Sequence, residues 1–215
     1  MQIIFYLFAN GHTQDGKTLS DLGERQVRES TIAHLKEIVF FTCISSGENN
    51  SCDTVETVRD QTPTPPLPHH VDRAFGWEWS AQVYPDFGVS AAVAYKDALG
   101  TCNPPDILSI LQARPRLWQL RGSMMTGILS TAQSIAYRAR AQKSKNEPIH
   151  VLVTTHHFLV SLCAMNPFQN WSRHADIMRI QVDAKRSQND DEIYQSNITI
   201  AESTLLHCPP INYPD

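Results

Sequence analysis

Two histidine-bearing segments carry the residue types that acid–base chemistry needs. His12 stands in "ANGHT", just after the apolar run "QIIFYLF", and His156 closes the apolar run of "IHVLVTTHH". Imidazole takes up and returns protons near neutral pH more readily than other side chains. If both runs are strands of one parallel sheet, their carboxyl ends meet at the edge where α/β folds bind ligands. His12 and His156 are therefore candidate catalytic residues, with a polar rim residue and a neutral histidine under a loop as the respective alternatives.

A carboxylate between two indoles is the third candidate for catalysis. Glu78 lies between Trp77 and Trp79 in "FGWEWS". Desolvation by the indoles would raise the pKa of this carboxyl, which could then act as a general acid near neutrality. The same alternation also fits a strand with both tryptophans on one face and a solvated glutamate on the other. Asp72 is the second candidate for the acid.

The composition excludes several classes of partner. The chain has 215 residues, of which 41% are hydrophobic and 19% charged, as is typical of one globular domain. A net charge of −4 with scattered basic residues favours neither nucleic acid nor a membrane as partner. The adjacent histidine pairs lack the HExxH and HxH spacings of metal sites, so neither a metal nor a cofactor is expected. Five irregularly spaced cysteines indicate reduced thiols in a cytoplasmic protein. The expected partner is a small-molecule substrate, and a homodimer is left open.

Apolar runs that alternate with helical patterns predict an α/β fold. Strands are expected at residues 2–8, 37–46, 149–157, 176–183 and 197–204. Helices are expected at residues 19–35, with Ser20 as N-cap, and at 52–61, 122–142 and 158–165. The aperiodic residues 69–122 are expected to form an insertion over the carboxyl edge of the sheet, within a single domain spanning residues 1–215.

The order of these motifs resembles that of the histidine phosphatase, or phosphoglycerate mutase-like, superfamily. In that family the first strand ends in an Arg-His-Gly-Glu-Thr-like motif and "LTxLGxxQ" opens the first helix. An "SSPLxRAxQTA" segment then supplies an arginine, and a late strand ends in a second histidine. The segments "ANGHT", "LSDLGERQ", "SSGENNSCDTV" and "VLVTTHH" follow the same order, and "NWSRHADIMRIQVD" looks most like fungal branches that act on small molecules. The resemblance implies a three-layer α/β/α sandwich with a mostly parallel central sheet.

Several positions depart from the pattern of that family. Ala9 stands at the phosphate-binding arginine, Asn10 at the phosphorylated histidine and Asn50 at the second arginine, while His156 matches the second catalytic histidine. An amide is no nucleophile for phosphorus. Each lost hydrogen bond to a charged group costs ~1.5–3 kcal/mol, so phosphate affinity should fall by several orders of magnitude. The resemblance also places a general acid in the middle of the chain, for which Glu78 is the first candidate and Asp72 the second. Substrate contacts are expected at Asn10, Asn50, His157, Trp77, Trp79 and Asp72.

Three functions stay open at this point. The favoured one is a repurposed enzyme that uses acid–base chemistry on a non-phosphorylated organic molecule, as a lyase, isomerase or cyclase in fungal natural-product biosynthesis. Its reaction would be a cyclisation, dehydration or isomerisation. The second is a catalytically inactive pseudophosphatase that serves as a binding or scaffold protein, and the third is a residual phosphatase. A scaffold has no need of histidines, a carboxylate and aromatic residues at one site, which is why the first is favoured.

Overall fold

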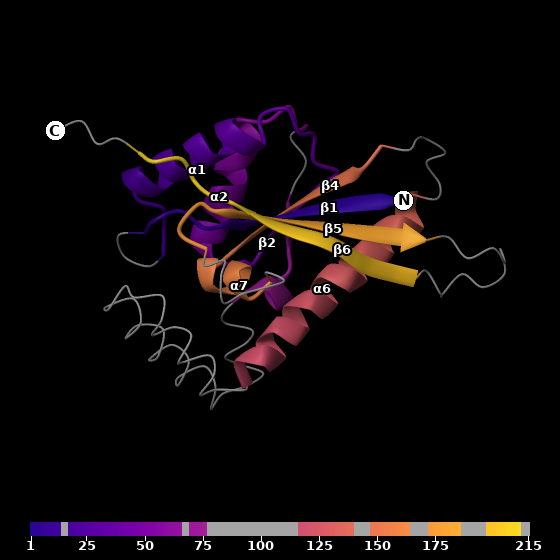
Figure 1. Cartoon of the computed structure of the whole chain (residues 1–215). Helices are drawn as coiled ribbons and strands as arrows, with labels where there is room; N and C mark the ends of the chain where they lie inside the picture. The colour runs from indigo at the N-terminus through magenta and orange to yellow at the C-terminus, as the bar shows by residue number, and fades with distance from the viewer. Residues whose placement is uncertain are drawn as a thin grey trace.

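The computed structural model describes residues 1–13, 17–65, 69–76, 116–139, 147–163, 172–185 and 197–211. The strands in these ranges are β1 (Gln2–Ala9), β2 (Thr42–Ser45), β3 (His70–Val71), β4 (Ile149–Thr155), β5 (Ile177–Lys185) and β6 (Asn197–Leu206). The helices are α1 (Asp21–His34), α2 (Asn49–Asp60), α6 (Arg116–Ala139) and α7 (His157–Leu162), together with a short 3₁₀ helix, η1 (Arg73–Phe75). Strands and helices alternate along most of the chain, as the sequence predicts (Figure 1).

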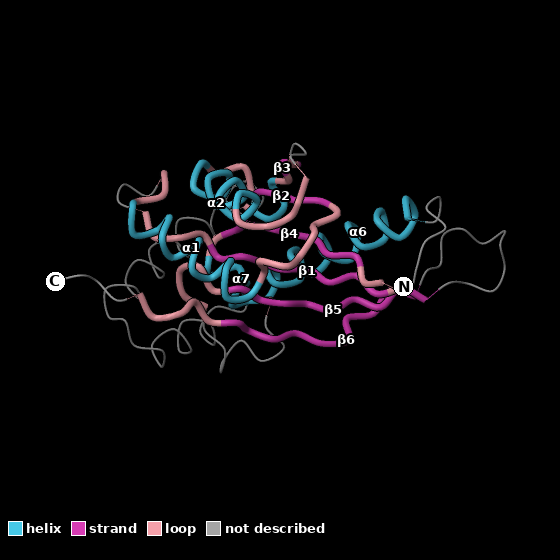
Figure 2. Tube along the Cα trace, turned by 90° about the horizontal axis from the view of Figure 1, so that it is seen from above, coloured by secondary structure: helices cyan, strands magenta, loops and turns pink. Residues whose placement is uncertain are grey.

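The described strands form one mixed sheet in the order β3-β2-β4-β1-β5-β6 (Figure 2). β2 pairs parallel with β3 and with β4, and β4 pairs parallel with β1. β5 is antiparallel to both of its neighbours, β1 and β6. The prediction of a mostly parallel α/β sheet is confirmed. The carboxyl ends of β1, β2 and β4 therefore meet the amino end of β5 at one edge of the sheet.

Alternate side chains of β1 face two different helical layers. The odd-numbered residues from Ile3 to Leu7 pack in a core cluster with residues of α6 and α7. The even-numbered residues from Ile4 to Phe8 pack in a second cluster with residues of α1 and α2. Figure 1 shows α6 on one side of the strands and α1 with α2 on the other. Because both faces are covered, the strand must be apolar along its whole length, which explains its continuous hydrophobic run.

The first helix begins at the residue that the sequence predicts. Ser20 is the N-cap, and its Oγ accepts a hydrogen bond from the backbone N–H of Gly23 at 3.1 Å. This bond satisfies one of the N–H groups that lack an intrahelical partner in the first turn. Asp21 and Glu24 lie in the same turn, where negative charge interacts favourably with the helix dipole.

Several predicted boundaries differ from the structure on the amino side of their elements, and the helix expected at 52–61 begins at Asn49. The strand expected at 37–46 is confined to Thr42–Ser45. Phe40 precedes it and is only 2% exposed, whereas Val39 is 52% exposed, so the apolar run belongs partly to a connection that buries one aromatic ring. The helix expected at 122–142 begins earlier, at Arg116.

The expected insertion at 69–122 overlaps the core at both of its ends. His70 and Val71 form β3, and the fully buried Phe75 packs in the cluster of α6 and α7. Residues 116–122 belong to α6. Residues 77–115, including Trp77, Glu78 and Trp79, lie outside the described part of the chain.

Two further observations concern membrane-spanning helices and the cysteine thiols. In the described ranges no helix combines the length and apolar character that crossing a membrane requires. Cys43, Cys52, Cys163 and Cys208 are free thiols. Burial raises the pKa of Cys43 to about 11 and that of Cys163 to about 12, so both are unreactive as nucleophiles near neutral pH.

Candidate active site

Asn10 lies at the edge where the parallel strands end. It follows β1 directly, and its backbone N–H donates to the carbonyl of Thr155 at 2.9 Å. Ala9 is paired with Thr155 in the sheet, so Asn10 and His156 are the next residues on two adjacent strands. The sheet register thereby brings together two positions that are far apart in the sequence.

The side chains of Asn10 and Asn50 form an amide pair. Nδ2 of Asn10 donates to Oδ1 of Asn50 at 3.2 Å, and the two residues are only 3% and 8% exposed. Oδ1 of Asn10 is buried and has no hydrogen-bond partner in the described part of the chain. Two uncharged amides thus occupy the positions at which the resemblance expects a nucleophilic histidine and an arginine.

A buried hydroxyl network fixes the start of α2, which carries Asn50. Oγ of Ser51 donates to the carbonyl of Thr154 at 2.8 Å, and Oγ1 of Thr154 donates to the carbonyl of Ser51 at 2.9 Å. The backbone N–H of Ser46 donates to Oγ of Ser51 at 3.0 Å. Ser51 and Thr154 are both fully buried. The network ties α2 to the end of β4 and holds Asn50 next to Asn10.

His12 is anchored by the first turn of α1. Its carbonyl accepts hydrogen bonds from the backbone N–H of Ser20 at 3.0 Å and from Oγ of Ser20 at 3.1 Å. Its ring Nδ1 lies 2.9 Å from the same Oγ, and its backbone N–H donates to Oε1 of Gln26 at 3.0 Å. A Cβ at Gly23 would collide with the carbonyl oxygen of His12, so the "LSDLG" segment needs glycine there for this close approach.

Four histidine rings form a continuous group beside Asn10. The ring of His174 meets those of His12 and His157 edge to face, with centroids 5.7 and 4.7 Å apart. The rings of His156 and His157 are stacked with centroids 4.3 Å apart. Nδ1 of His174 lies 3.2 Å from the carbonyl oxygen of Asn10. A carbonyl can only accept, so Nδ1 of His174 carries the proton and Nε2 is the basic nitrogen.

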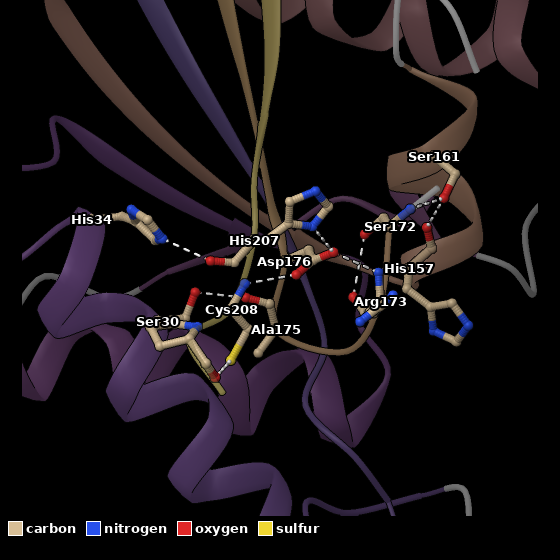
Figure 3. Close-up of polar contacts among 11 residues, drawn as sticks. Ser30, His34, His157, Ser161, Ser172, Arg173, Ala175, Asp176, His207 and Cys208 are labelled. Carbon is tan, nitrogen blue, oxygen red and sulfur yellow. Dashed lines mark hydrogen bonds and ion pairs between the residues drawn. The ribbon is translucent and has the colours of Figure 1, made fainter. Parts of the chain in front are cut away.

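The loop before β5 (residues 172–176, the pre-β5 loop) delivers His174 and is tied down on several sides (Figure 3). Ala175 has a φ of 59°, a left-handed conformation that costs an alanine roughly 1–2 kcal/mol. Its N–H donates to the carbonyl of Ala9 at 3.0 Å, and its carbonyl accepts from Oγ of Ser30 at 2.7 Å. These bonds fix the strained conformation against β1 and α1.

Asp176 anchors the other end of the pre-β5 loop. Its carboxylate is 1% exposed and accepts from the backbone N–H of Arg173 at 2.8 Å and of Cys208 at 2.7 Å. Nδ1 of His207 lies 3.1 Å from the same carboxylate (Figure 3). The segment after β6 therefore helps to hold the loop that carries His174.

Burial keeps the inner histidines uncharged at neutral pH. Desolvation, with a smaller contribution from His174, lowers the pKa of His156 to about 4 and that of His157 to about 3. Desolvation also lowers the pKa of His174. At pH 7 these imidazoles are neutral, and they supply hydrogen-bonding groups rather than positive charge to this edge of the sheet.

The structure brings some of the predicted site residues together and leaves others apart. Asn10, Asn50, His12, His156 and His157 all lie at the carboxyl edge. Asp72 also follows a strand there, since its N–H donates to the carbonyl of Ser45.

The carboxylate of Asp72 is used in the fold, because it caps η1 by accepting from the N–H of Ala74 at 2.9 Å. Glu78, Trp77 and Trp79 lie outside the described residues. The described histidine, cysteine, aspartate and glutamate side chains contain no cluster suited to a metal ion.

Two residues of the site are absent from the sequence-based prediction of its functional residues. His174 stands in the segment "SRHAD" before a strand, whereas the prediction considered residues that follow strands. Ser20 was predicted as a helix cap, and its second contact, with the ring of His12, depends on how the loop after β1 folds back. For both residues, only contacts between distant parts of the chain identify them as members of the site.

Two solved structures share the fold of this chain. A phosphoglycerate mutase from Bacillus anthracis str. Sterne matches with a TM-score of 0.52 and 18% identity, over 93% of this chain and 92% of that one. A protein described as mycobacterial hydrolase 2 matches with a TM-score of 0.52 and 13% identity, over 98% of this chain and 93% of that one. No protein-family model and no curated protein matches the sequence. The chain therefore shares its fold with a phosphoglycerate mutase, and this is the fold that the motif order predicts.

Proposed function

We propose that this chain is an enzyme that carries out acid–base chemistry on a non-phosphorylated, neutral organic molecule bound at the carboxyl edge of the sheet. The observation that carries this proposal is the amide pair of Asn10 and Asn50. It lies where the fold's phosphatases, by the resemblance, hold a nucleophile and a guanidinium group.

Electrostatics argue against a phosphoryl substrate at this edge. A phosphate needs fixed positive charge, and guanidinium groups supply it best. Here the amides are neutral, and the lowered pKa values of His156 and His157 leave these rings uncharged at pH 7. Moving a charged phosphate from water to such surroundings without a cation is strongly unfavourable. A neutral ligand meets no such penalty.

The histidines divide into two roles. The contacts of Ser20 leave Nε2 of His12 as a basic nitrogen, so His12 is the proton acceptor in this proposal. A pKa of about 4 makes His156 a weak base, and its neutral ring is better suited to polarise a carbonyl or hydroxyl group by hydrogen bonding. Of the two histidines that the sequence analysis names as candidate catalytic residues, this assignment gives the main proton transfer to His12.

Such a set of groups supports reactions in which a proton leaves one atom of the substrate and returns to another. Isomerisation, dehydration and cyclisation belong to this class, and none of them requires a covalent enzyme intermediate. The aromatic and carboxylate residues predicted around Glu78 would add an acid to this set.

Two assays test the proposal together. Hydrolysis of p-nitrophenyl phosphate should stay at background, because neither amide can attack phosphorus. Exchange of the α-hydrogens of a panel of cyclic ketones and β-diketones in D2O should be catalysed and can be followed by mass spectrometry. His12→Gln should lower the exchange rate about 10²–10⁴-fold, which is the usual contribution of a positioned proton-transfer group.

His70→Gln is the matched control, because His70 is exposed on β3 and outside the site. Its exchange rate should equal that of the wild type. Phosphatase turnover that disappears in His12→Gln would overturn the proposal in favour of residual phosphatase activity. Absence of exchange across the panel, with a protein partner that co-purifies with the chain, would favour a pseudophosphatase with a binding role.

A further inference from the structure

The side-chain amide of Asn10 has one polar atom, Oδ1, that no described residue satisfies. Its backbone N–H donates to Thr155, and its carbonyl accepts from Nδ1 of His174 at 3.2 Å and the N–H of Ala175 at 3.3 Å. Its Nδ2 donates to Asn50. Among the described residues Oδ1 finds no hydrogen-bond partner, and it is buried in a residue that is 3% exposed.

Buried acceptors without partners are rare in folded proteins, and each calls for an explanation such as a ligand or a bound water. The side chain of Asn10 cannot turn away without giving up its bond to Asn50. Reversing this amide alone would place two oxygens against each other, because Oδ1 of Asn50 is the acceptor of the pair. With the two amides oriented as in the structure, Oδ1 of Asn10 is the acceptor that the pair leaves over.

We propose that Oδ1 of Asn10 is the recognition point for a ligand hydroxyl, enol or N–H group, so that the substrate is a neutral molecule with a hydrogen-bond donor beside its reacting carbon. This inference rests on the proposed function and names its substrate class. An ammonium donor fits less well, because a cation at this place would be buried beside an amide rather than a carboxylate.

Matched small molecules that differ by one donor test this inference. The probes are phenol with anisole, and cyclohexanol with its methyl ether, with inorganic phosphate as the anion. Binding is followed on the folded, ¹⁵N-labelled protein through the side-chain NH2 signals of Asn10 and Asn50, assigned with Asn10→Leu and Asn50→Leu. In the wild type the alcohols should shift the Asn10 signal and bind about tenfold more tightly than their ethers, because the ethers leave the buried oxygen unsatisfied.

The variant Asn10→Leu removes the acceptor and keeps most of the side-chain volume. The preference for alcohol over ether should disappear in it, while Ser134→Ala, on the exposed face of α6, should keep the preference. If Asn10→Leu does not fold, the affinities of alcohol and ether for the wild type are sufficient to test the inference.

Three outcomes would overturn the inference. Ethers that bind as tightly as alcohols would show that Oδ1 does not receive the ligand donor, although a neutral ligand as such would still fit the proposed function. No shift by any probe at millimolar concentration would mean that only a buried water meets this oxygen. A shift by inorganic phosphate with millimolar or tighter affinity would overturn the proposed function as well.

Discussion

Oγ of Ser20 lies 2.9 Å from the ring Nδ1 of His12 and 3.1 Å from the carbonyl oxygen of the same residue. The hydroxyl has a single hydrogen, and the carbonyl can only accept, so that hydrogen is directed to the carbonyl. Nδ1 of His12 must then carry its own proton. One serine thereby caps a helix and sets the tautomer of the candidate base.

The first prediction is that His12 is an Nδ1–H tautomer in the resting protein, with Nε2 unprotonated. Long-range ¹H–¹⁵N spectra of the histidine rings distinguish the two nitrogens. His174 should show the same tautomer, because its Nδ1 donates to the carbonyl of Asn10. An Nε2–H tautomer for His12 at pH 7.5 would contradict the assignment of this ring as the base.

Two substitutions at Ser20 test whether this residue fixes the tautomer of His12. Ser20→Ala removes both the contact with His12 and the helix cap, so the tautomer should no longer be fixed, and the free energy of unfolding should fall by about 1 kcal/mol. Ser20→Asp keeps an acceptor for the Gly23 N–H and for Nδ1 of His12, so the Nδ1–H tautomer should persist. A tautomer unaffected by Ser20→Ala would mean that another group positions this ring.

The second prediction compares two helical glycines. Gly23→Ala places a methyl group against the carbonyl of His12, so the loop after β1 must move, and we expect a loss of more than about 1 kcal/mol in stability. Gly122→Ala in α6 meets no atom within 4 Å and should stabilise the protein by roughly 0.5–1 kcal/mol, because alanine favours a helix more than glycine does. Urea unfolding measures both, and equal effects would contradict the close packing at Gly23.

The third prediction concerns the hydroxyl network below Asn50. Ser51→Ala removes the bonds of this hydroxyl to the N–H of Ser46 and to the carbonyl of Thr154, which keep their 3.2 Å bond to each other. The free energy of unfolding should fall by about 1–3 kcal/mol. Ser134→Ala, which removes an exposed hydroxyl on α6, should change it by less than about 0.5 kcal/mol. A mild effect of Ser51→Ala would show that the start of α2 is held by other contacts.

The fourth prediction is that acid destabilises the protein through His156. Its pKa is about 4 in the folded chain and about 6.5 when unfolded, so between these pH values the unfolded chain binds a proton that the folded chain does not. The free energy of unfolding should fall as the pH drops, by about 3 kcal/mol for this residue at pH 4. His156→Gln should reduce the difference between pH 7.5 and pH 4.5, whereas His70→Gln should leave it unchanged. An undiminished difference in His156→Gln would contradict the lowered pKa.

The sequence predicts the fold well where burial is complete. The run before Ala9 is apolar on both faces, which only a central strand between two helical layers requires. Predictions were weaker where a loop is as buried as a strand. Phe40 is nearly as inaccessible as the β1 residues, so hydrophobicity alone extended β2 into the connection before it.

The sequence predicted those site residues that directly follow a strand and missed those that long-range contacts bring to the site. Asn10 and His156 follow paired strands, and this local feature places them together once the sheet is known. His174 reaches the same edge from a strand of opposite direction, and its loop is fixed by partners as distant as Ser30 and Cys208. A single sequence carries no local signal for such long-range hydrogen bonds.

The direction of β5 makes its two ends unequal for protein engineering. Ile177, at one end, pairs with Phe8 and continues the loop that presents His174, so one residue inserted there would rotate or displace this ring. Lys185, at the other end, pairs with Asn197 at the opposite edge of the sheet. Peptide tags or fluorescent reporters are therefore best inserted after Lys185, because an insertion at this end of β5 does not displace the loop that carries His174.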